Sequence, residues 1–512
     1  MFSLGLSAAN LGIQSYLVKV EVDISSGLPS FSIVGLPDTA VKESKDRVTA
    51  AIKNSGFSLP NKKITINLAP ASIKKEGACF DLPIALGLLS AQGFVSSEEL
   101  KRYLILGELS LQGKVRRVKG VLPISLFISK KEEIKGIILP EENKKEAAIV
   151  KGLNVYPVGD LNEAVSFINR EKHIDMYGLN IEDEFNRHKD YLIDFSDVKG
   201  QSYAKRAIEV ACAGGHNILL IGPPGSGKTM LARRIPTILP DLTLEEALET
   251  TKIHSIIGFI NESISVIGTR PFRAPHHTIS DIALIGGGTY PKPGEVSLSH
   301  NGVLFLDELP EFHRNVLEVL RQPLEDGIVN ISRATTSLTF PAKFMLVAAM
   351  NPCPCGFYGD IHRDCTCSPF QIHKYRSKVS GPLLDRIDIH IEVPSVKFDE
   401  LTEEYGAEPS FRIRQRVQKA NELQKERFKH YKNIYCNAHM ESSHIRKFCR
   451  LDKDSKKLLE LALKEFGFSA RAYDRIIKVA RTIADLDLSE QIRSSHIAEA
   501  VQYRSLDKQV FV

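Results

Sequence analysis

The pattern of apolar and polar residues predicts a chain of mixed α and β structure. Residues 17 to 24 alternate apolar and charged side chains, as a half-buried strand does. The same reasoning predicts the other elements of the first 170 residues: strands over 30–34, 63–68 and 104–109, a helix from Asp38 or Thr39 to Gly56, and an apolar helix over 82–89. Strands and helices mixed in this way indicate a compact α+β domain.

Beyond residue 194, strands and helices alternate, which is the pattern of a doubly wound sheet. The predicted elements are a helix over 201–213, apolar strands over 218–221, 303–306, 344–349 and 389–393, and a hairpin over 328–339. Amphipathic helices follow, including 455–466 and 470–485. The charged, patternless stretch from about 171 to 193 suits a linker.

Composition and charge exclude few functions. The 512 residues suit about three domains, and a hydrophobic fraction of 43% is that of an ordinary soluble protein. A net charge of +5 neither demands nor excludes nucleic acid. No segment is apolar enough to span a bilayer, and the N-terminus lacks the basic region of a secretory signal. We therefore expect a cytoplasmic protein whose eight cysteines serve as thiols or metal ligands.

The strand at 218–221 runs into a glycine-rich loop with the spacing of a phosphate-binding loop. The loop reads Gly222-Pro223-Pro224-Gly225-Ser226-Gly227-Lys228-Thr229. Glycines let the backbone wrap an anion, and the N–H groups at the start of the next helix face it. Lys228 adds charge for the β- and γ-phosphates, and Thr229 offers a hydroxyl to Mg²⁺. We therefore expect ATP and Mg²⁺ as the cofactors.

Three further residues complete a hydrolytic site. Asp307 ends a predicted strand and could hold Mg²⁺ through water, and Glu308 could polarise the attacking water. Asn351 follows the strand at 344–349 and could place that water. Alone, Asp307 and Glu308 could be no more than a strand-ending turn. Beside the phosphate loop we favour a Mg²⁺-dependent ATPase.

Four of these segments together resemble the AAA+ motor of magnesium-chelatase-like ATPases: 222–229, 306–308, Asn351 and 381–388. Residues 270–280 and 351–355 are similar to the YifB/ComM family in particular, and the resemblance covers essentially the whole chain. It implies four parts: a Lon-protease-like (S5-like) α+β domain over 1–172, a linker over 173–193, an AAA+ core with pore-loop insertions over 194–395, and a helical lid over 396–512.

In the first part, residues 75–82 resemble the segment that carries the catalytic serine of Lon proteases, with Cys79 in place of the serine. The position of Lon's catalytic lysine falls on Leu122. A serine–lysine dyad needs the amine as its base. The resemblance therefore implies a domain without proteolytic activity, in which Cys79 is a small buried residue and not a nucleophile.

The resemblance also assigns two arginines to the ATPase reaction. In similar motors the residue that matches Arg386 reaches into the ATP site of the neighbouring subunit, where it neutralises phosphoryl charge. The alternative is a salt bridge with Asp385 or Asp388. Residues 467–471 resemble the start of the lid helix that carries a second nucleotide-sensing arginine. We assign that role to Arg471, with Arg475 as the competing choice.

Two loops carry candidate DNA contacts. Lys292 lies in a predicted turn at 289–294, and Arg333 lies near the tip of the predicted hairpin. In similar motors such loops line the central pore, where these side chains could follow a phosphate backbone. The alternative is ordinary solvated charge, which is also the favoured interpretation of the basic helix at 412–419.

Two close cysteine pairs, Cys353 with Cys355 and Cys365 with Cys367, have the composition of a tetrahedral zinc knuckle. The alternative is a reduced loop without metal. Three other residues of the loop are spare candidate ligands: Asp360, His362 and Asp364.

The resemblance to this family implies a homo-oligomeric ring, with a hexamer expected, that couples ATP hydrolysis to movement on DNA. Branch migration in recombination or natural transformation is the leading function. A chelatase-type motor subunit for metal insertion into a tetrapyrrole and a protein-remodelling ATPase remain alternatives. Salt-sensitive stimulation of the ATPase by DNA would separate the first from the other two.

Overall fold

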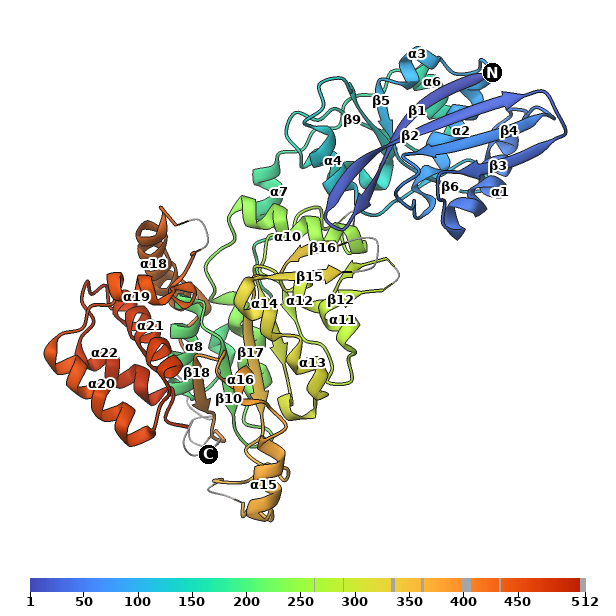
Figure 1. The fold of residues 1–512 in the computed structure, drawn as a ribbon. Helices are drawn as coiled ribbons and strands as arrows, with labels where there is room; N and C mark the ends of the chain where they lie inside the picture. Colours follow the sequence, from blue (N-terminus) through green and yellow to red (C-terminus); the bar gives the residue numbers. More distant parts are fainter. Residues whose placement is uncertain are drawn as a thin grey trace. The chain divides into compact units, whose positions relative to one another are not determined.

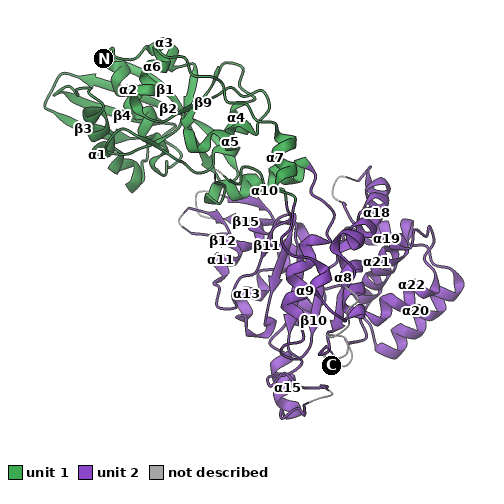
Figure 2. Ribbon diagram, turned by 180° about the vertical axis from the view of Figure 1, so that it is seen from behind, with its two compact units in different colours: residues 1–189, 244–268 green, residues 190–243, 269–512 purple. Residues whose placement is uncertain are grey.

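The computed structural model describes residues 1–506 apart from 262, 289, 333–336, 361–362, 397–406 and 432–433. The chain forms two compact units, coloured separately in Figure 2. Unit 1 comprises residues 1–189 and 244–268, and unit 2 comprises 190–243 and 269–512. Within the described ranges, no helix is long and apolar enough to cross a membrane.

Unit 1 is built on a seven-stranded mixed sheet in the order β3-β4-β2-β1-β5-β8-β9 (Figure 1). Its strands are β1 Phe2–Leu11, β2 Gln14–Ser25, β3 Ser30–Val34, β4 Lys63–Ala69, β5 Tyr103–Ile105, β8 Gly136–Pro140 and β9 Val155–Val158, with a separate pair β6 Glu108–Leu109 and β7 Val115–Arg116. Its helices are α1 Thr39–Asn54, α2 Asp81–Ala91, α3 Ser97–Leu100, α4 Val121–Ile128, α5 Lys144–Ala148, α6 Leu161–Ile168, α7 Ile181–Arg187 and α10 Leu244–Ile257. Every residue of α2 is buried, so this helix forms the centre of the core. The predicted mixed α and β elements are confirmed here.

Three features of unit 1 differ from the sequence prediction. Strand β1 was not predicted, because its buried positions include Ser3 and Ser7, which are polar residues satisfied by backbone carbonyls. The single strand predicted over 104–109 is divided into β5 and β6, because the N–H of Gly107 leaves the sheet to bond the carbonyl of Cys79. The stretch expected to be a patternless linker contains α7, which Asn180 caps and Phe185 anchors in the interior.

Helix α10 belongs to unit 1, although its sequence lies between two strands of unit 2. It packs against α4, where the N–H of Gly120 donates to the carbonyl of Ser255 at 3.0 Å. The Ser255 hydroxyl donates to the Glu146 carboxylate at 2.5 Å. Burial raises the pKa of Glu146, although the hydrogen bonds that its carboxylate accepts, including the one from Ser255, oppose the shift. The insertion therefore completes a buried polar cluster of unit 1.

Unit 2 contains a five-stranded sheet in the order β11-β14-β17-β10-β18, in which every pair is parallel. The strands are β10 Ile218–Ile221, β11 Phe272–Arg273, β14 Val303–Leu306, β17 Met345–Met350 and β18 Ile389–Glu392. Two hairpins accompany it, β12 Gly286–Gly287 with β13 Lys292–Pro293, and β15 Ile328–Ser332 with β16 Ser337–Pro341. The predicted doubly wound sheet and the hairpin over 328–339 are confirmed.

The helices that accompany this sheet are α8 Ser202–Gly214, α9 Lys228–Arg234, α11 Asp281–Ile285, α12 Glu295–Leu298, α13 Arg314–Glu318, α14 Arg321–Asp326, α15 Pro369–Arg376 and α16 Gly381–Leu384. The C-terminal helices are α18 Ser410–Phe428, α19 Ser442–Phe448, α20 Lys453–Phe466, α21 Ala470–Leu486 and α22 Ser494–Gln502. Helices α18 and α21 both pack on α8, which directly precedes β10. The C-terminal helices thus share one hydrophobic core with the sheet.

Candidate ATP site and cysteine cluster

The phosphate-binding loop lies between β10 and α9, as the sequence predicts. Gly225 and Gly227 adopt the left-handed region, with φ of 79° and 84°. A Cβ on Gly222 would stand 2.1 Å from the carbonyl oxygen of Val393, so the backbone there passes too close to the end of β18 for any side chain. Strand, glycine loop and helix N-terminus form the frame of an anion site.

Lys228 is held inside this loop and is only 8% exposed. Its Nζ donates to the carbonyls of Gly222 at 2.7 Å and Pro223 at 2.8 Å, and lies 3.3 Å from Oδ1 of Asn351. Burial lowers the pKa of this amine to about 8, and the nearby carboxylates oppose the shift. A phosphate in the loop would favour the charged amine.

Thr229 and Asp307 meet at the tip of β14. The threonine hydroxyl donates to Oδ2 of Asp307 at 2.7 Å. Mg²⁺ takes oxygen ligands and is commonly held by one hydroxyl and one carboxylate beside the phosphates. The donor set and its position next to the loop therefore fit Mg²⁺.

Glu308 and Asn351 open into a cavity of about 450 Å³. The remaining residues that line it are Glu311, Pro354, Gln371, Lys374, Tyr375 and Lys378. The Glu308 side chain is 56% exposed, and its carboxylate lies 3.5 Å from Nδ1 of His277. A carboxylate in a solvent-filled cavity beside the phosphate loop can reach a water molecule.

Two residues of this site were not predicted to take part. His277, which faces Glu308, lies in the segment 270–280. The sequence of this segment resembles a known family but gave no chemical role for the histidine. Gln201 adopts a left-handed conformation with φ of 55°, and its amide donates to the carbonyl of Ser226 at 2.6 Å. The sequence shows only that Gln201 lies at the start of α8. Its contact with Ser226 spans 25 residues, so no local sequence pattern reveals it.

Arg386 makes neither of the two salt bridges weighed as alternatives. It forms an ion pair with Glu325 of α14 and donates to the carbonyl of Pro382 at 2.6 Å. Its side chain is 16% exposed, and its buried Nε–H has no hydrogen-bond partner among the described residues. Asp385 instead lies 3.4 Å from Arg471.

The two candidate lid arginines differ in their environment. Arg471 is 73% exposed, whereas Arg475 is mostly buried and pairs with Asp388. Asp388 also lies 3.1 Å from Nδ1 of His216. Burial alone would raise the pKa of Asp388, but Arg475 and His216 hold it well below its usual range. Arg475 is thus committed to a buried network, and Arg471 is accessible.

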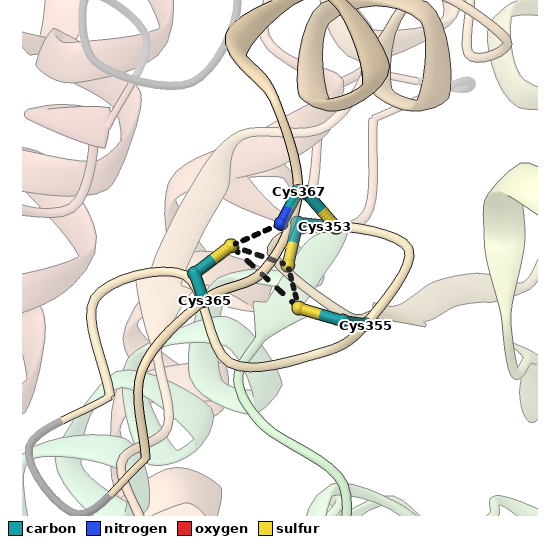
Figure 3. Close-up of side chains that lie close together, drawn as sticks. All are labelled: Cys353, Cys355, Cys365 and Cys367. Atoms are coloured by element: carbon teal, nitrogen blue, oxygen red, sulfur yellow. Dashed lines mark hydrogen bonds between the residues drawn. The ribbon is translucent and has the colours of Figure 1, made fainter.

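The four predicted cysteine ligands converge (Figure 3). Their sulfur atoms all lie within 4.8 Å of one another. The Cys353–Cys355, Cys355–Cys365 and Cys353–Cys365 sulfur pairs are 3.3, 3.6 and 3.7 Å apart. A tetrahedral zinc with Zn–S bonds of about 2.3 Å has S–S edges of about 3.8 Å. The set therefore fits zinc, and the four thiols are free of disulfides.

The cysteine loop packs directly on the phosphate loop. Gly356, with φ of 89°, lies so close to Pro224 that a Cβ would stand 2.5 Å from the proline Cδ. The backbone N–H of Phe357 and other hydrogen bonds lower the pKa of the Cys355 thiol to about 5. Asp360, one of the spare candidate ligands, accepts a hydrogen bond from the N–H of Arg363 at 3.0 Å. His362 lies outside the described residues.

In unit 1 the thiol of Cys79 is half-buried and carries a pKa raised to about 12, because burial and the carboxylates of Asp81 and Asp38 disfavour the thiolate. Leu122 is fully buried at the start of α4. The lysine nearest to Cys79 in sequence, Lys75, is also fully buried and donates to the carbonyls of Pro70 and Ile73. The absence of proteolytic activity from this unit stays a prediction.

Of the two candidate DNA contacts, Lys292 is exposed in the β12–β13 hairpin. Arg333 lies outside the described residues. In the basic helix α18, Arg414 pairs with Asp241 at 3.3 Å, and Arg416 pairs with Glu209 and Glu408 at 2.5 Å. These pairs agree with a solvated basic face whose charges are partly neutralised within the chain.

Comparison with known proteins identifies the family. The family model for magnesium chelatase, subunit ChlI, matches residues 194–401, and the model for its C-terminal part matches 407–504. A third model, subunit ChlI of Mg-chelatase, matches residues 20–143.

Relatives match the chain over its length. It is 46% identical to the competence protein ComM of Haemophilus influenzae, over 98% of this chain and 97% of that protein. It is 45% identical to YifB of Escherichia coli, over 98% and 96%. The magnesium-chelatase 67 kDa subunit of Chlorobaculum parvum is 28% identical over 31% of this chain and 24% of that subunit. The chain therefore belongs to the YifB/ComM family of magnesium-chelatase-like AAA+ ATPases.

Proposed function

We propose that this protein is a ring-forming ATPase that couples ATP hydrolysis to movement on DNA. The observation that supports it best is the joint placement of Lys228, Thr229, Asp307 and Asn351 around one glycine loop. Lys228 holds the phosphates, and Thr229 with Asp307 holds Mg²⁺, which neutralises phosphate charge. The family of ComM, a competence protein, supports DNA as the substrate.

Within one subunit, Glu308 activates the attacking water and Asn351 orients it. His277, at 3.5 Å from the Glu308 carboxylate, positions that carboxylate toward the cavity. A Glu308→Gln variant should bind ATP with near-normal affinity and lose at least about 100-fold in turnover. Full turnover by this variant would show that Glu308 is not the base.

Arg386 acts on the ATP of a neighbouring subunit, in a ring that we expect to be a hexamer. In the absence of a neighbour's ATP, the guanidinium of Arg386 is paired with Glu325, and the phosphates of that ATP would compete with Glu325 for it. A mixing experiment tests this role. Arg386→Ala and Lys228→Ala proteins should each be inactive, whereas mixed rings should regain activity, because a Lys228→Ala subunit supplies Arg386 to an intact phosphate loop. No recovery in rings proven to be mixed would contradict action across the interface.

Arg471 senses the nucleotide from the lid, and Arg475 holds the lid to the core. Exposure of the first and burial of the second support this division. The cysteine cluster binds a structural zinc that braces the phosphate loop through Gly356. The resemblance suggests four parts, with boundaries near residues 172, 193 and 395; the two compact units differ from it in that α7 and residues 244–268 belong to unit 1.

Lys292 and Arg333 contact the DNA backbone from two loops of the pore. The test is the ATPase rate with and without single-stranded, duplex and four-way-junction DNA at two salt concentrations. Stimulation should weaken with salt, and each of Lys292→Ala and Arg333→Ala should reduce the dependence on log[salt] by about one unit. Lys457→Ala, which removes an exposed lysine of α20, is the matched control and should change nothing.

Protein that hydrolyses ATP but responds to none of these DNAs would overturn the DNA proposal. The substrate would then be a protein, or a tetrapyrrole as in a chelatase. A dependence on tetrapyrrole and partner subunits would identify the latter.

A further inference from the structure

A second cavity of unit 2, of about 610 Å³, lies outside the ATP site. It is lined by residues of α13, α14, α15 and α16 and by Tyr358 of the cysteine loop. Its lining includes Arg314, Arg321, His373 and Arg376, and none of the described residues that line it is acidic. The chain as a whole is nearly balanced, with 67 basic and 62 acidic residues, so this is a local excess of positive charge.

Two of these arginines have N–H groups that could donate hydrogen bonds to a ligand. Arg314 is exposed at the start of α13. Arg321 is held by Glu318 and by Ser380, whose hydroxyl lies 3.1 Å from its Nη2, but its buried Nε–H has no hydrogen-bond partner among the described residues. A buried guanidinium N–H without an acceptor is costly, and a phosphate oxygen is the acceptor that guanidinium groups match best.

The cavity also has an aromatic wall. The Tyr358 ring is 48% exposed, and the guanidinium of Arg376 lies 5.1 Å from its centre. Arg376 is oriented by the carbonyl of Pro352, to which its Nε donates at 3.0 Å. An exposed ring beside cationic groups is the composition that binds a base and a phosphate together. The volume lies within the range of small-molecule sites, which is about 300–1,000 Å³.

We propose that this cavity binds a nucleotide unit, with its phosphate on Arg314 and Arg321 and its base on Tyr358. The same chemistry is offered by a free nucleotide and by one residue of a nucleic-acid strand. A carboxylate from a neighbouring subunit could pair with the arginines, but it would make no use of the exposed ring. The site shares no residue with the phosphate loop and does not depend on ATP turnover.

The absence of tryptophan from the chain provides a direct test. A Tyr358→Trp substitution places a single tryptophan at the cavity. It is made in full-length Lys228→Ala protein, so that the phosphate loop contributes little. The probes are ATP without Mg²⁺, a 15-residue thymidine oligonucleotide and inorganic tripolyphosphate. The emission should change saturably with a nucleotide probe, and more weakly with tripolyphosphate, which lacks a base.

Variants then locate the signal. Arg321→Gln and Arg314→Gln should each weaken binding about tenfold, because each removes a charge-assisted contact. Arg450→Gln, which removes an exposed arginine of unit 2 far along the sequence, is the control and should have no effect. Anisotropy of a fluorescein-labelled oligonucleotide with Tyr358 intact repeats the comparison without the reporter.

A response to the oligonucleotide alone identifies a nucleic-acid strand as the ligand, and a response to ATP alone identifies a free nucleotide. Three results would overturn the proposal: no response to either nucleotide, a response that Arg321→Gln and Arg314→Gln leave unchanged, or a signal that follows only protein concentration. The last would mean that a neighbouring subunit fills the cavity. Stimulation of the wild-type ATPase by DNA is measured separately, so either proposal can fail alone.

Discussion

Two buried lysines, one in each unit, make the same kind of backbone contact in different surroundings. Lys228 and Lys75 both donate to two backbone carbonyls of their own loop. Burial lowers the pKa of both amines. Lys228 also lies beside Asn351 and near Asp307 and Glu308, whereas only burial shifts the pKa of Lys75. A buried amine therefore makes an anion site only where its surroundings also hold the ligands for a metal and a water.

The two units also differ in whether their candidate reactive residues come together. In unit 2 the residues that the sequence marks as reactive meet at one sheet edge. In unit 1, Leu122 stands at the position where the resemblance to Lon proteases leads us to expect an amine, and burial keeps Cys79 a neutral thiol.

The largest expected difference comes from removing each lysine. Lys228→Ala should reduce ATP turnover by at least about 100-fold, because phosphoryl charge loses a preorganised donor. It should also lower the free energy of unfolding by about 2–3 kcal/mol, since two buried carbonyls lose their donor. Lys75→Ala should leave turnover per folded molecule unchanged and lower the free energy of unfolding by about 1–3 kcal/mol, since two part-buried carbonyls lose their donor. Steady-state ATPase assays and urea unfolding measure both. Equal losses of turnover would break the comparison.

The second prediction asks whether an amine can be restored to unit 1. Leu122→Lys combined with Cys79→Ser should yield no peptidase activity and should destabilise the protein by about 3 kcal/mol, because a charge is placed in the core. Leu111→Lys, at a leucine that is 57% exposed, is the matched control and should cost little. Casein degradation and thermal unfolding are the measurements. Serine-dependent proteolysis by the double variant would show that unit 1 retains more of a protease than we infer.

The third prediction tests how far the active region of unit 2 extends. Gly356→Ala should lower ATP turnover about tenfold without changing how much of the proposed zinc is bound, because the new methyl displaces Pro224 of the phosphate loop. Gly359→Ala is the control, since its φ of 79° is similar and a Cβ there meets nothing within 4 Å. Both variants carry the same backbone strain. Equal effects would mean that strain in the loop, and not the contact with Pro224, affects turnover.

The smallest expected effect is the uptake of a proton when ATP binds. Free Lys228 has a pKa of about 8 and is mostly neutral at pH 9, but a bound triphosphate favours its charged form. ATP binding should therefore take up as much as about one proton at pH 9, and affinity should fall by at most about tenfold per pH unit above 8. Calorimetry in buffers of different ionisation enthalpy measures this uptake. The Cys79 thiol, with a pKa of about 12, should stay unreactive to iodoacetamide over the same range.

The local parts of this structure could be predicted from sequence, and the long-range contacts could not. The apolar run before Gly222 and the glycine spacing after it fix strand, loop and helix within 12 residues. The partner of Arg386 is Glu325, 61 residues away, so the two nearby aspartates were the only candidates that sequence offered. Strand β1 escaped prediction because serine hydroxyls, which bond to carbonyls, occupy buried positions. The roles of Glu308, Arg386 and Arg471 in turnover stay predictions.

The chain crosses between its two units three times, at residues 189/190, 243/244 and 268/269. Cutting the chain at residue 190 would separate α10, which stays with unit 2, from its packing partner α4. The N-terminal fragment would keep Glu146 but lose Ser255, which donates a hydrogen bond to it. The units are therefore not separable modules. Genetic exchange of one contiguous end of the gene at any of these three crossings would divide at least one unit between two parental sequences.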